Sequence, residues 1–167
     1  MTVRKWLIAG LALVAGVSVS IYLNTAPEKE QGKVTGIDQF QLPDLDGKAQ
    51  DLKQWQGKVL LVNFWATWCP PCREEIPVFL SLRNKFSSTG FEVVGVSIDD
   101  VRKVKEYRDS MQIDYPLLDG EENCMSMMMK LGSPSGGLPF RILYDRSGNV
   151  VHSKSGPFDD QELRGLI

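Results

Sequence analysis

A Cys-x-x-Cys motif, Cys69 to Cys72, lies between a strongly apolar segment and an amphipathic one. The preceding segment, Val59–Trp65, is apolar except for Asn63, which is typical of a central strand covered on both faces. From Cys69 to about Ser87, apolar residues recur at helical spacing, which predicts a helix. The motif therefore lies at a strand-to-helix junction, where free backbone N–H groups and the helix dipole favour a thiolate at Cys69.

The motif has three interpretations. A redox-active dithiol fits the strand–motif–helix context. An inert structural disulfide is the second, but a ring closed by so few residues constrains the unfolded chain very little. The third is half of a zinc site completed by Cys124 and His152, although those two are lone residues and zinc knuckles usually contain glycine. We expect the redox-active dithiol, and no metal and no cofactor.

Composition excludes several classes of protein. The chain has 167 residues, which supports one domain rather than two. Its net charge of −2 provides no basic face for nucleic acid. With 3 cysteines the chain is no disulfide-stapled miniprotein, and with 1 histidine it lacks most hydrolytic triads and every multi-histidine metal site. An enzyme or binding domain of moderate size remains.

Residues 1–26 form a separate segment. Arg4-Lys5 precedes an uncharged apolar run, Leu7–Leu23, whose length falls between a signal-peptide core and a membrane-spanning helix. We expect an uncleaved membrane anchor, with a cleaved signal peptide as the alternative. The two basic residues predict a cytoplasmic N-terminus and place the rest of the chain outside the cytoplasm. The expected location is the inner membrane with the domain facing the periplasm, or the periplasm itself after cleavage.

The folded domain is expected at residues 37–167, after a polar tether at 27–36. Helical and strand patterns alternate along it and end in a hairpin, which predicts an α/β three-layer sandwich with a mixed central sheet. A short hairpin that turns at Asp46-Gly47 precedes the first buried strand. The expected strands are 40–42, 49–52, 59–65, 91–98, 115–118, 140–144 and 150–154, and the expected helices are 69–87, 100–111, 121–131 and 159–167.

The motif and its flanks resemble a known family. The stretch from Val62 to Glu75, VNFWATWCPPCREE, is similar to the TlpA/ResA group of membrane-anchored thiol–disulfide oxidoreductases of the thioredoxin superfamily. The resemblance covers about residues 37–160 and includes the leading hairpin, Pro77, and the pair Leu138-Pro139, which resembles the family's cis-proline site. It implies a thioredoxin-like fold with the leading hairpin as an N-terminal extension.

The resemblance also implies roles for the motif residues. Cys69 would be the nucleophile that attacks a substrate disulfide, and Cys72 the resolving thiol that releases the reduced substrate. Glu75 lies on the same helix face as Cys72 and matches the carboxylate that manages the proton of the buried thiol. The alternative for Glu75 is a solvated helix charge. Asn63 replaces the buried aspartate of ordinary thioredoxins. Because an amide cannot accept the proton of the buried thiol, that role would fall to Glu75.

Substrate binding is expected at Trp68, Leu138 and Pro139. Trp68 would form part of an apolar rim, with core packing as the alternative, and Pro139 would present the backbone of Leu138 to an extended substrate segment. A cis bond before Pro139 is implied by the resemblance. The chain departs from the family here, because relatives read Gly-x-Pro-Thr-Thr-Phe where this chain reads GLPFRI at 137–142.

Two weaker signals have ordinary interpretations. Cys124-Met125-Ser126-Met127-Met128-Met129 is expected to pack in the core, with a pliable docking surface or a copper site as alternatives. His152 is expected on the surface.

The resemblance implies an extracytoplasmic reductase of protein disulfides. Its partners would be disulfide-containing protein substrates, a transmembrane thiol-transfer protein that supplies electrons, and the membrane, and cytochrome c maturation is one pathway among several. A thiol peroxidase is the alternative enzyme, but peroxiredoxins carry threonine three residues before the reactive cysteine, where this chain has Ala66. The alternative outside enzymes is a metal-binding or copper-delivery module, but copper-delivery relatives of this fold use a wider cysteine spacing and a ligand histidine.

Overall fold

A computed structural model describes residues 40–121, 124–133 and 135–157. The strands in these residues are β1 (Gln41–Pro43), β2 (Ala49–Asp51), β3 (Val59–Trp65), β4 (Phe91–Ser97), β5 (Leu117–Asp119), β6 (Phe140–Tyr144) and β7 (Val150–Ser155). The helices are α2 (Pro70–Phe86), α3 (Val101–Met111) and α4 (Cys124–Lys130), with short 3-10 turns η2 (Leu52–Trp55) and η3 (Ser87–Thr89). Most expected elements are confirmed, although β5 and the helix α4 that follows it differ from their expected bounds by a few residues.

Five strands form the central sheet in the order β5-β4-β3-β6-β7. β3, β4 and β5 run parallel, whereas β6 and β7 are antiparallel additions, so the expected mixed sheet is confirmed. β1 and β2 form the separate leading hairpin, which is tied to β5 by a bridge between Asp44 and Leu118. Parallel strands in the centre explain why β3 and β4 are apolar along most of their length, because both faces are covered.

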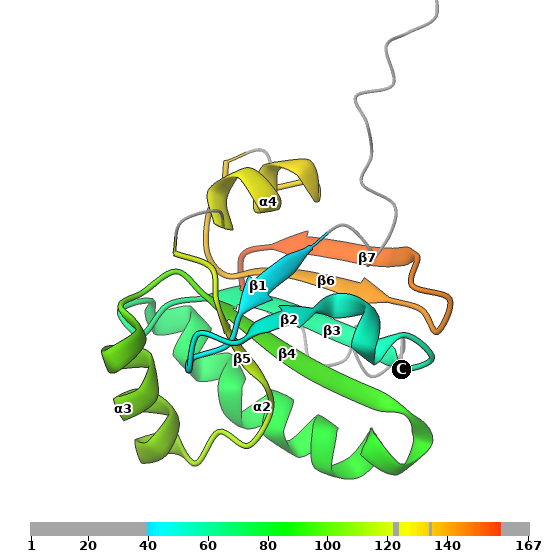
Figure 1. Cartoon of the computed structure of the whole chain (residues 1–167), viewed down its shortest axis with the longest axis horizontal. Coiled ribbons are helices and arrows are strands. Elements are labelled where there is room, and N and C mark those ends of the chain that lie inside the picture. Colours follow the sequence, from blue (N-terminus) through cyan, green and yellow to red (C-terminus); the bar gives the residue numbers. More distant parts are fainter. Residues whose placement is uncertain (1–39, 122–123, 134, 158–167) are drawn as a thin grey trace, which may run out of the picture. The chain divides into compact units, whose positions relative to one another are not determined.

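Side chains alternate between two apolar clusters, one on each face of the sheet. On one face, α2 and α3 cover Leu61 and Trp65 of β3; on the other, α4 and the leading hairpin cover Leu60, Val62 and Phe64 (Figure 1). These are the three layers that the sequence predicts. Trp55 and Trp65 lie in the core as expected.

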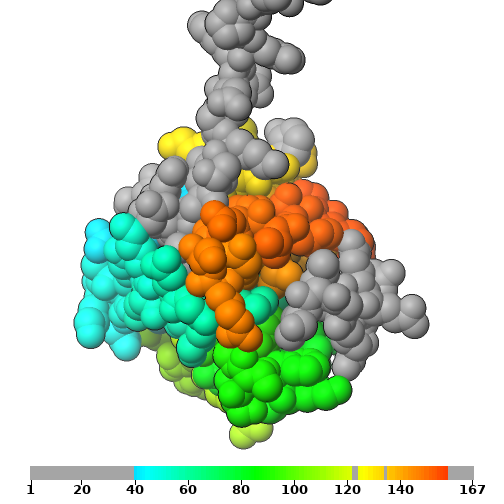
Figure 2. Space-filling model, turned by 90° about the vertical axis from the view of Figure 1, so that its right-hand side faces the viewer, coloured from blue at the N-terminus to red at the C-terminus, as the bar shows by residue number. Residues whose placement is uncertain are grey.

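Arg146, in the turn between β6 and β7, connects turns that are distant in the sequence. In Figure 2 this orange turn lies beside the blue-green segment that contains η2. Arg146 donates to the carbonyl of Gly57, two residues after η2, at 3.3 Å. Arg146 also donates to the carbonyl of Thr89 at 2.9 Å. One arginine therefore joins three turns.

Three expected segments lie outside the described residues: the apolar segment 1–26, the tether 27–36 and the helix 159–167. In the part of the chain that is described, no helix has both the length and the apolar character needed to cross a membrane.

Candidate active site

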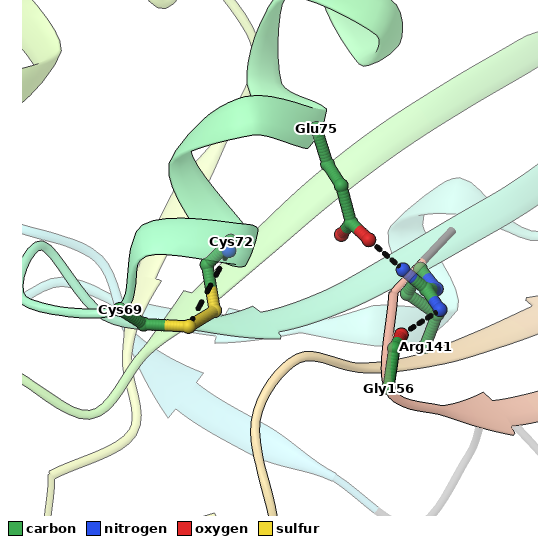
Figure 3. Close-up of a disulfide and its surroundings, with 5 residues drawn as sticks. All are labelled: Cys69, Cys72, Glu75, Arg141 and Gly156. Atoms are coloured by element: carbon green, nitrogen blue, oxygen red, sulfur yellow. Dashed lines mark hydrogen bonds and ion pairs between the residues drawn. A yellow bond between two sulfur atoms is a disulfide. The ribbon is translucent and has the colours of Figure 1, made fainter. Parts of the chain in front are cut away.

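Cys69 and Cys72 are joined by a disulfide at the start of α2 (Figure 3). Cys69 caps the helix with an extended backbone, and its Sγ accepts a hydrogen bond from the backbone N–H of Cys72 at 3.4 Å. Pro70 and Pro71 occupy the first helical positions, where a missing N–H group costs little. The Cys69 sulfur thus lies at the positive end of the helix dipole, so a thiolate formed there on reduction is favoured.

The loop that presents Cys69 is held by a side-chain contact with the next loop of the sheet. The Thr67 hydroxyl, between β3 and α2, donates to the carboxylate of Asp99, between β4 and α3. Asp99 is buried and also accepts from the backbone N–H of Asp100 at 2.9 Å, while Asp100 caps α3. Because both loops follow neighbouring parallel strands, they meet at one end of the sheet, and the contact links the loop before Cys69 to the loop before α3.

The residues expected to bind substrate differ in exposure. Trp68, directly before the buried Cys69, is 62% exposed, so it is available to a partner and is not packed in the core. The Leu138–Pro139 peptide bond is cis, as the resemblance implies. Leu138 is partly buried and packs against the cluster that contains both cysteines, while the carbonyl of Pro139 accepts from Gly156 at 2.9 Å. Leu138 therefore contributes to the apolar surroundings of the disulfide.

Glu75 is buried, and it forms an ion pair with Arg141 of β6 (Figure 3). Glu75 is 4% exposed and Arg141 2%, so the interpretation of Glu75 as a solvated helix charge is wrong. Arg141 also donates to the carbonyl of Gly156, just after β7. The pair thus ties α2, one turn beyond Cys72, to the antiparallel edge of the sheet.

Sequence reasoning missed Arg141. The available signal was the departure from the family pattern after Pro139, where an arginine stands inside an otherwise apolar strand, Phe140–Tyr144. Alternation along β6 places Arg141 on the same face as Leu143, and Leu143 packs in the cluster beneath α2. A charged side chain at an inward strand position predicts an opposite charge across the layer.

The sheet surface beneath the ion pair is partly polar. Asn63 lies opposite Arg141 in the strand register, is fully buried, and its amide makes no hydrogen bond to any described residue. The Tyr115 hydroxyl is also buried, and its pKa is raised, first by burial and then by the negative charges of its surroundings, including Glu75. Glu75, Arg141, Asn63 and Tyr115 thus form a polar layer inside the apolar cluster.

Cys124 and its neighbours are divided between core and surface. Cys124, Met127 and Met128 are buried, whereas Met125 and Met129 are exposed. Burial raises the pKa of the Cys124 thiol to about 12, so this thiol is unreactive near neutral pH. Among the described residues, no three His, Cys, Asp or Glu side chains gather in a way that could hold a metal ion. His152 is half-buried on β7.

Comparison with known proteins agrees with this geometry. The AhpC/TSA family pattern matches residues 35–153. Thiol-disulfide oxidoreductase ResA of Bacillus subtilis (strain 168) is 30% identical over 160 residues, which cover 94% of this chain and 87% of that protein. The chain belongs to the AhpC/TSA family, among its ResA-like thiol–disulfide oxidoreductases. A ResA protein of Bacillus cereus is 29% identical over 160 residues, covering 94% of this chain and 90% of that protein.

A solved structure extends the likeness to the fold of this ResA-like chain. A thiol:disulfide interchange protein of the thioredoxin family from Chlorobium tepidum TLS superposes with a TM-score of 0.70 at 30% identity, covering 79% of this chain and 92% of that one. The predicted family, the thioredoxin-like fold with its hairpin extension, and the enzyme class are confirmed. The individual roles of Cys69, Cys72, Glu75, Trp68, Leu138 and Pro139 stay predictions.

Proposed function

We propose that this ResA-like oxidoreductase reduces disulfides of protein substrates through the Cys69/Cys72 couple. The observation that supports this proposal is the disulfide at the N-terminus of α2, with Cys69 as the capping residue. In the reduced protein, the Cys69 thiolate attacks a substrate disulfide, forms a mixed disulfide and displaces the first substrate thiolate. Cys72 then attacks the Cys69 sulfur, the Cys69–Cys72 bond forms, and the second substrate thiolate leaves. Two electrons pass from the dithiol to the substrate.

Glu75 is proposed to manage the proton of Cys72. The resolving thiol must lose its proton before it attacks, and it is buried, away from water. Glu75 follows Cys72 by three residues, so the two side chains lie on the same face of α2. Asn63, at the position where ordinary thioredoxins carry an acid, has no proton-accepting carboxylate, so among the described residues Glu75 is the buried carboxylate of α2 next to Cys72.

Trp68, Leu138 and Pro139 are proposed as the substrate-binding residues. The exposed indole of Trp68 adjoins Cys69, and Leu138 packs against the cluster that contains the cysteines although it lies far from them in the sequence. The backbone of Leu138, directly before Pro139, would pair with an extended segment of the substrate. A peptide held in this way would bring its disulfide toward the Cys69 sulfur.

The proposed setting is outside the cytoplasm. Residues 1–26 would anchor the protein in the inner membrane, 27–36 would act as a tether, and 37–167 would form the domain that faces the periplasm. Electrons would then come from a transmembrane thiol-transfer protein, and cytochrome c maturation is the proposed pathway. Labelling of Trp68→Cys in intact cells with a membrane-impermeant maleimide tests the orientation, since a cytoplasmic domain would stay unlabelled until lysis.

The direction of electron flow is tested by the midpoint potential of the full-length protein, measured by thiol alkylation across a series of redox buffers. A value below about −230 mV supports a reductase, and one above about −150 mV would identify an oxidant. The absence of any two-electron couple would overturn the proposal.

The roles of the two cysteines are tested by trapping. Cys72→Ser should accumulate a mixed disulfide between Cys69 and a protein substrate, because the resolving thiol is missing. Cys69→Ser should trap none. Cys124→Ser is the matched control, since it removes a buried third thiol and should behave as the wild type. Consumption of hydrogen peroxide at a rate equal to disulfide reduction would favour the peroxidase alternative instead.

A further inference from the structure

The Glu75–Arg141 pair lies one helical turn behind the disulfide, against the apolar cluster that contains both cysteines. Figure 3 shows the Glu75 side chain directed from α2 toward the Arg141 guanidinium rather than toward the sulfur atoms. Each of the two side chains is almost completely removed from water. The redox couple therefore operates beside two buried charges of opposite sign.

A buried carboxylate without a cation would tend to take up a proton, because the low-dielectric interior disfavours the ionised form. A guanidinium does not lose its proton in a protein, so its presence favours the ionised form of the carboxylate. The pair as a whole is neutral. A thiolate that forms on Cys69 or Cys72 thus meets little net charge from it, whereas either member alone would act on the thiolate with a full charge.

We propose that Arg141 is a positioning residue that fixes the charge of Glu75 and cancels it, so that the two cysteines titrate beside a neutral pair. This inference rests on the proposed function, in which Cys69 and Cys72 are the working couple. It also gives Glu75 a defined state: the carboxylate is in its proton-accepting form and is held in place by β6 when Cys72 must lose its proton.

Among the described residues, Arg141 is the one buried cation. Tyr115, before β5, is buried in the same cluster, and burial raises its pKa, which keeps it neutral at physiological pH. Asn63 of β3 is uncharged. On β7, Lys154 lies opposite Arg141 in the register, but it is more accessible to water. On α2, Arg73 and Glu74 flank the turn and are exposed, so their charges are screened.

The test is a set of charge variants of the full-length protein: Glu75→Gln, Arg141→Met and the double variant. The measurement is the pH at which alkylation of Cys69 in the reduced protein reaches half its maximal rate. Glu75→Gln leaves a cation and should lower this pH by about one unit, and Arg141→Met leaves an anion and should raise it by about one unit. At a pH below that midpoint, a shift of one unit changes the rate of Cys69 alkylation about tenfold. The double variant is neutral again and should match the wild type.

Two controls separate charge from structural damage. Arg141→Lys keeps the cation and should stay near the wild type. Arg83→Met breaks another ion pair of α2, about 16 Å along the helix from Cys72, and should leave the alkylation profile unchanged. If Arg141→Met does not fold, as judged by circular dichroism, the comparison of Glu75→Gln, the double variant and Arg141→Lys still decides the question.

The outcomes are distinct from those that test the proposed function. Equal profiles for all variants, or a shift of both single variants in one direction, would overturn the inference while leaving the oxidoreductase intact. A wild-type protein without a two-electron couple at Cys69/Cys72 would overturn the proposed function, whatever the variants show.

Discussion

Helix α2 makes two ion pairs with the sheet, and they are built in opposite ways. Near its start, Glu75 of the helix binds Arg141 of β6, and both side chains are almost completely out of contact with water. Near its end, Arg83 of the helix binds Glu92 of β4 at 2.5 Å, and the Arg83 side chain is 23% exposed. Arg83 lies in the last turn of α2, where a positive charge complements the helix dipole, whereas Glu75 lies beyond the first turn.

The second pair belongs to a network that is partly open to solvent. Glu92 also accepts from Lys58 at 3.1 Å, and Arg83 also contacts Asp114 at 3.2 Å. Burial alone would raise the pKa of Glu92, but hydrogen bonds from Arg83 and Lys58 outweigh it and lower that pKa. A partner lost from this network is replaced by a remaining partner or by water. The pair near the disulfide is closed to water, so water cannot replace a lost partner there.

The largest effect is expected at the buried pair. Arg141→Met should cost about 3–5 kcal/mol in the free energy of unfolding, because it removes one member of a buried ion pair and leaves the other charge in the interior. Adding Glu75→Gln should recover much of this loss, since the second change removes the charge. Urea unfolding followed by tryptophan fluorescence measures both. A loss below about 1 kcal/mol for Arg141→Met would mean that the two ion pairs of α2 are energetically alike.

A smaller effect is expected at the other end of the helix. Arg83→Met should cost about 1 kcal/mol, because Lys58 and water remain available to Glu92 and the pair is partly exposed. The same urea titration gives the value, and Arg141→Met measured in parallel is the reference. A loss as large as that of Arg141→Met would contradict the contrast between an open network and a closed pair.

Acid should weaken the Glu92 network in a defined pH range. The folded-state pKa of Glu92 is lowered, so its contribution is present above the unfolded-state pKa, about 4.3, and is lost as the pH falls through the lower folded-state value. Glu92→Gln should therefore be less stable than the wild type at pH 7, with the difference shrinking below about pH 4. Urea midpoints at about pH 7, 5 and 3.5 measure it, and a difference that stays constant with pH would exclude this charge as the cause.

The two pairs also show which features the sequence could predict. Strand, motif and helix were predictable around Cys69 because they depend on neighbouring residues: an apolar run, two prolines in the first turn and helical periodicity. The partner of Glu75 could not be predicted in this way. Arg141 reaches Glu75 only because β6 pairs with β3, which places residue 141 beside residue 63, and no local sequence pattern relates those two positions. Helical spacing places Glu75, but not Glu74, on the same face as Cys72, whereas the burial of Glu75 depends on how α2 packs on the sheet.

A solvent-exposed ion pair provides the lower limit of the comparison. Lys105 of α3 binds Asp46 of the leading hairpin at 2.8 Å, but the Asp46 side chain is largely exposed. Lys105→Met should change the free energy of unfolding by about 0.5 kcal/mol or less, because solvent screens the charges and ordering two long side chains costs entropy. Any loss should disappear as the salt concentration is raised to about 1 M, where the screening length falls to about 3 Å.

Urea titrations at low and high salt measure this effect. The same pair of titrations on Arg141→Met should show a loss that salt leaves almost unchanged, since salt does not enter the buried layer. A salt-sensitive loss at Arg141 would mean that its ion pair with Glu75 is open to solvent. The buried Glu75–Arg141 pair would then not differ in kind from the partly exposed Arg83–Glu92 pair, because solvent ions would screen the charges of both.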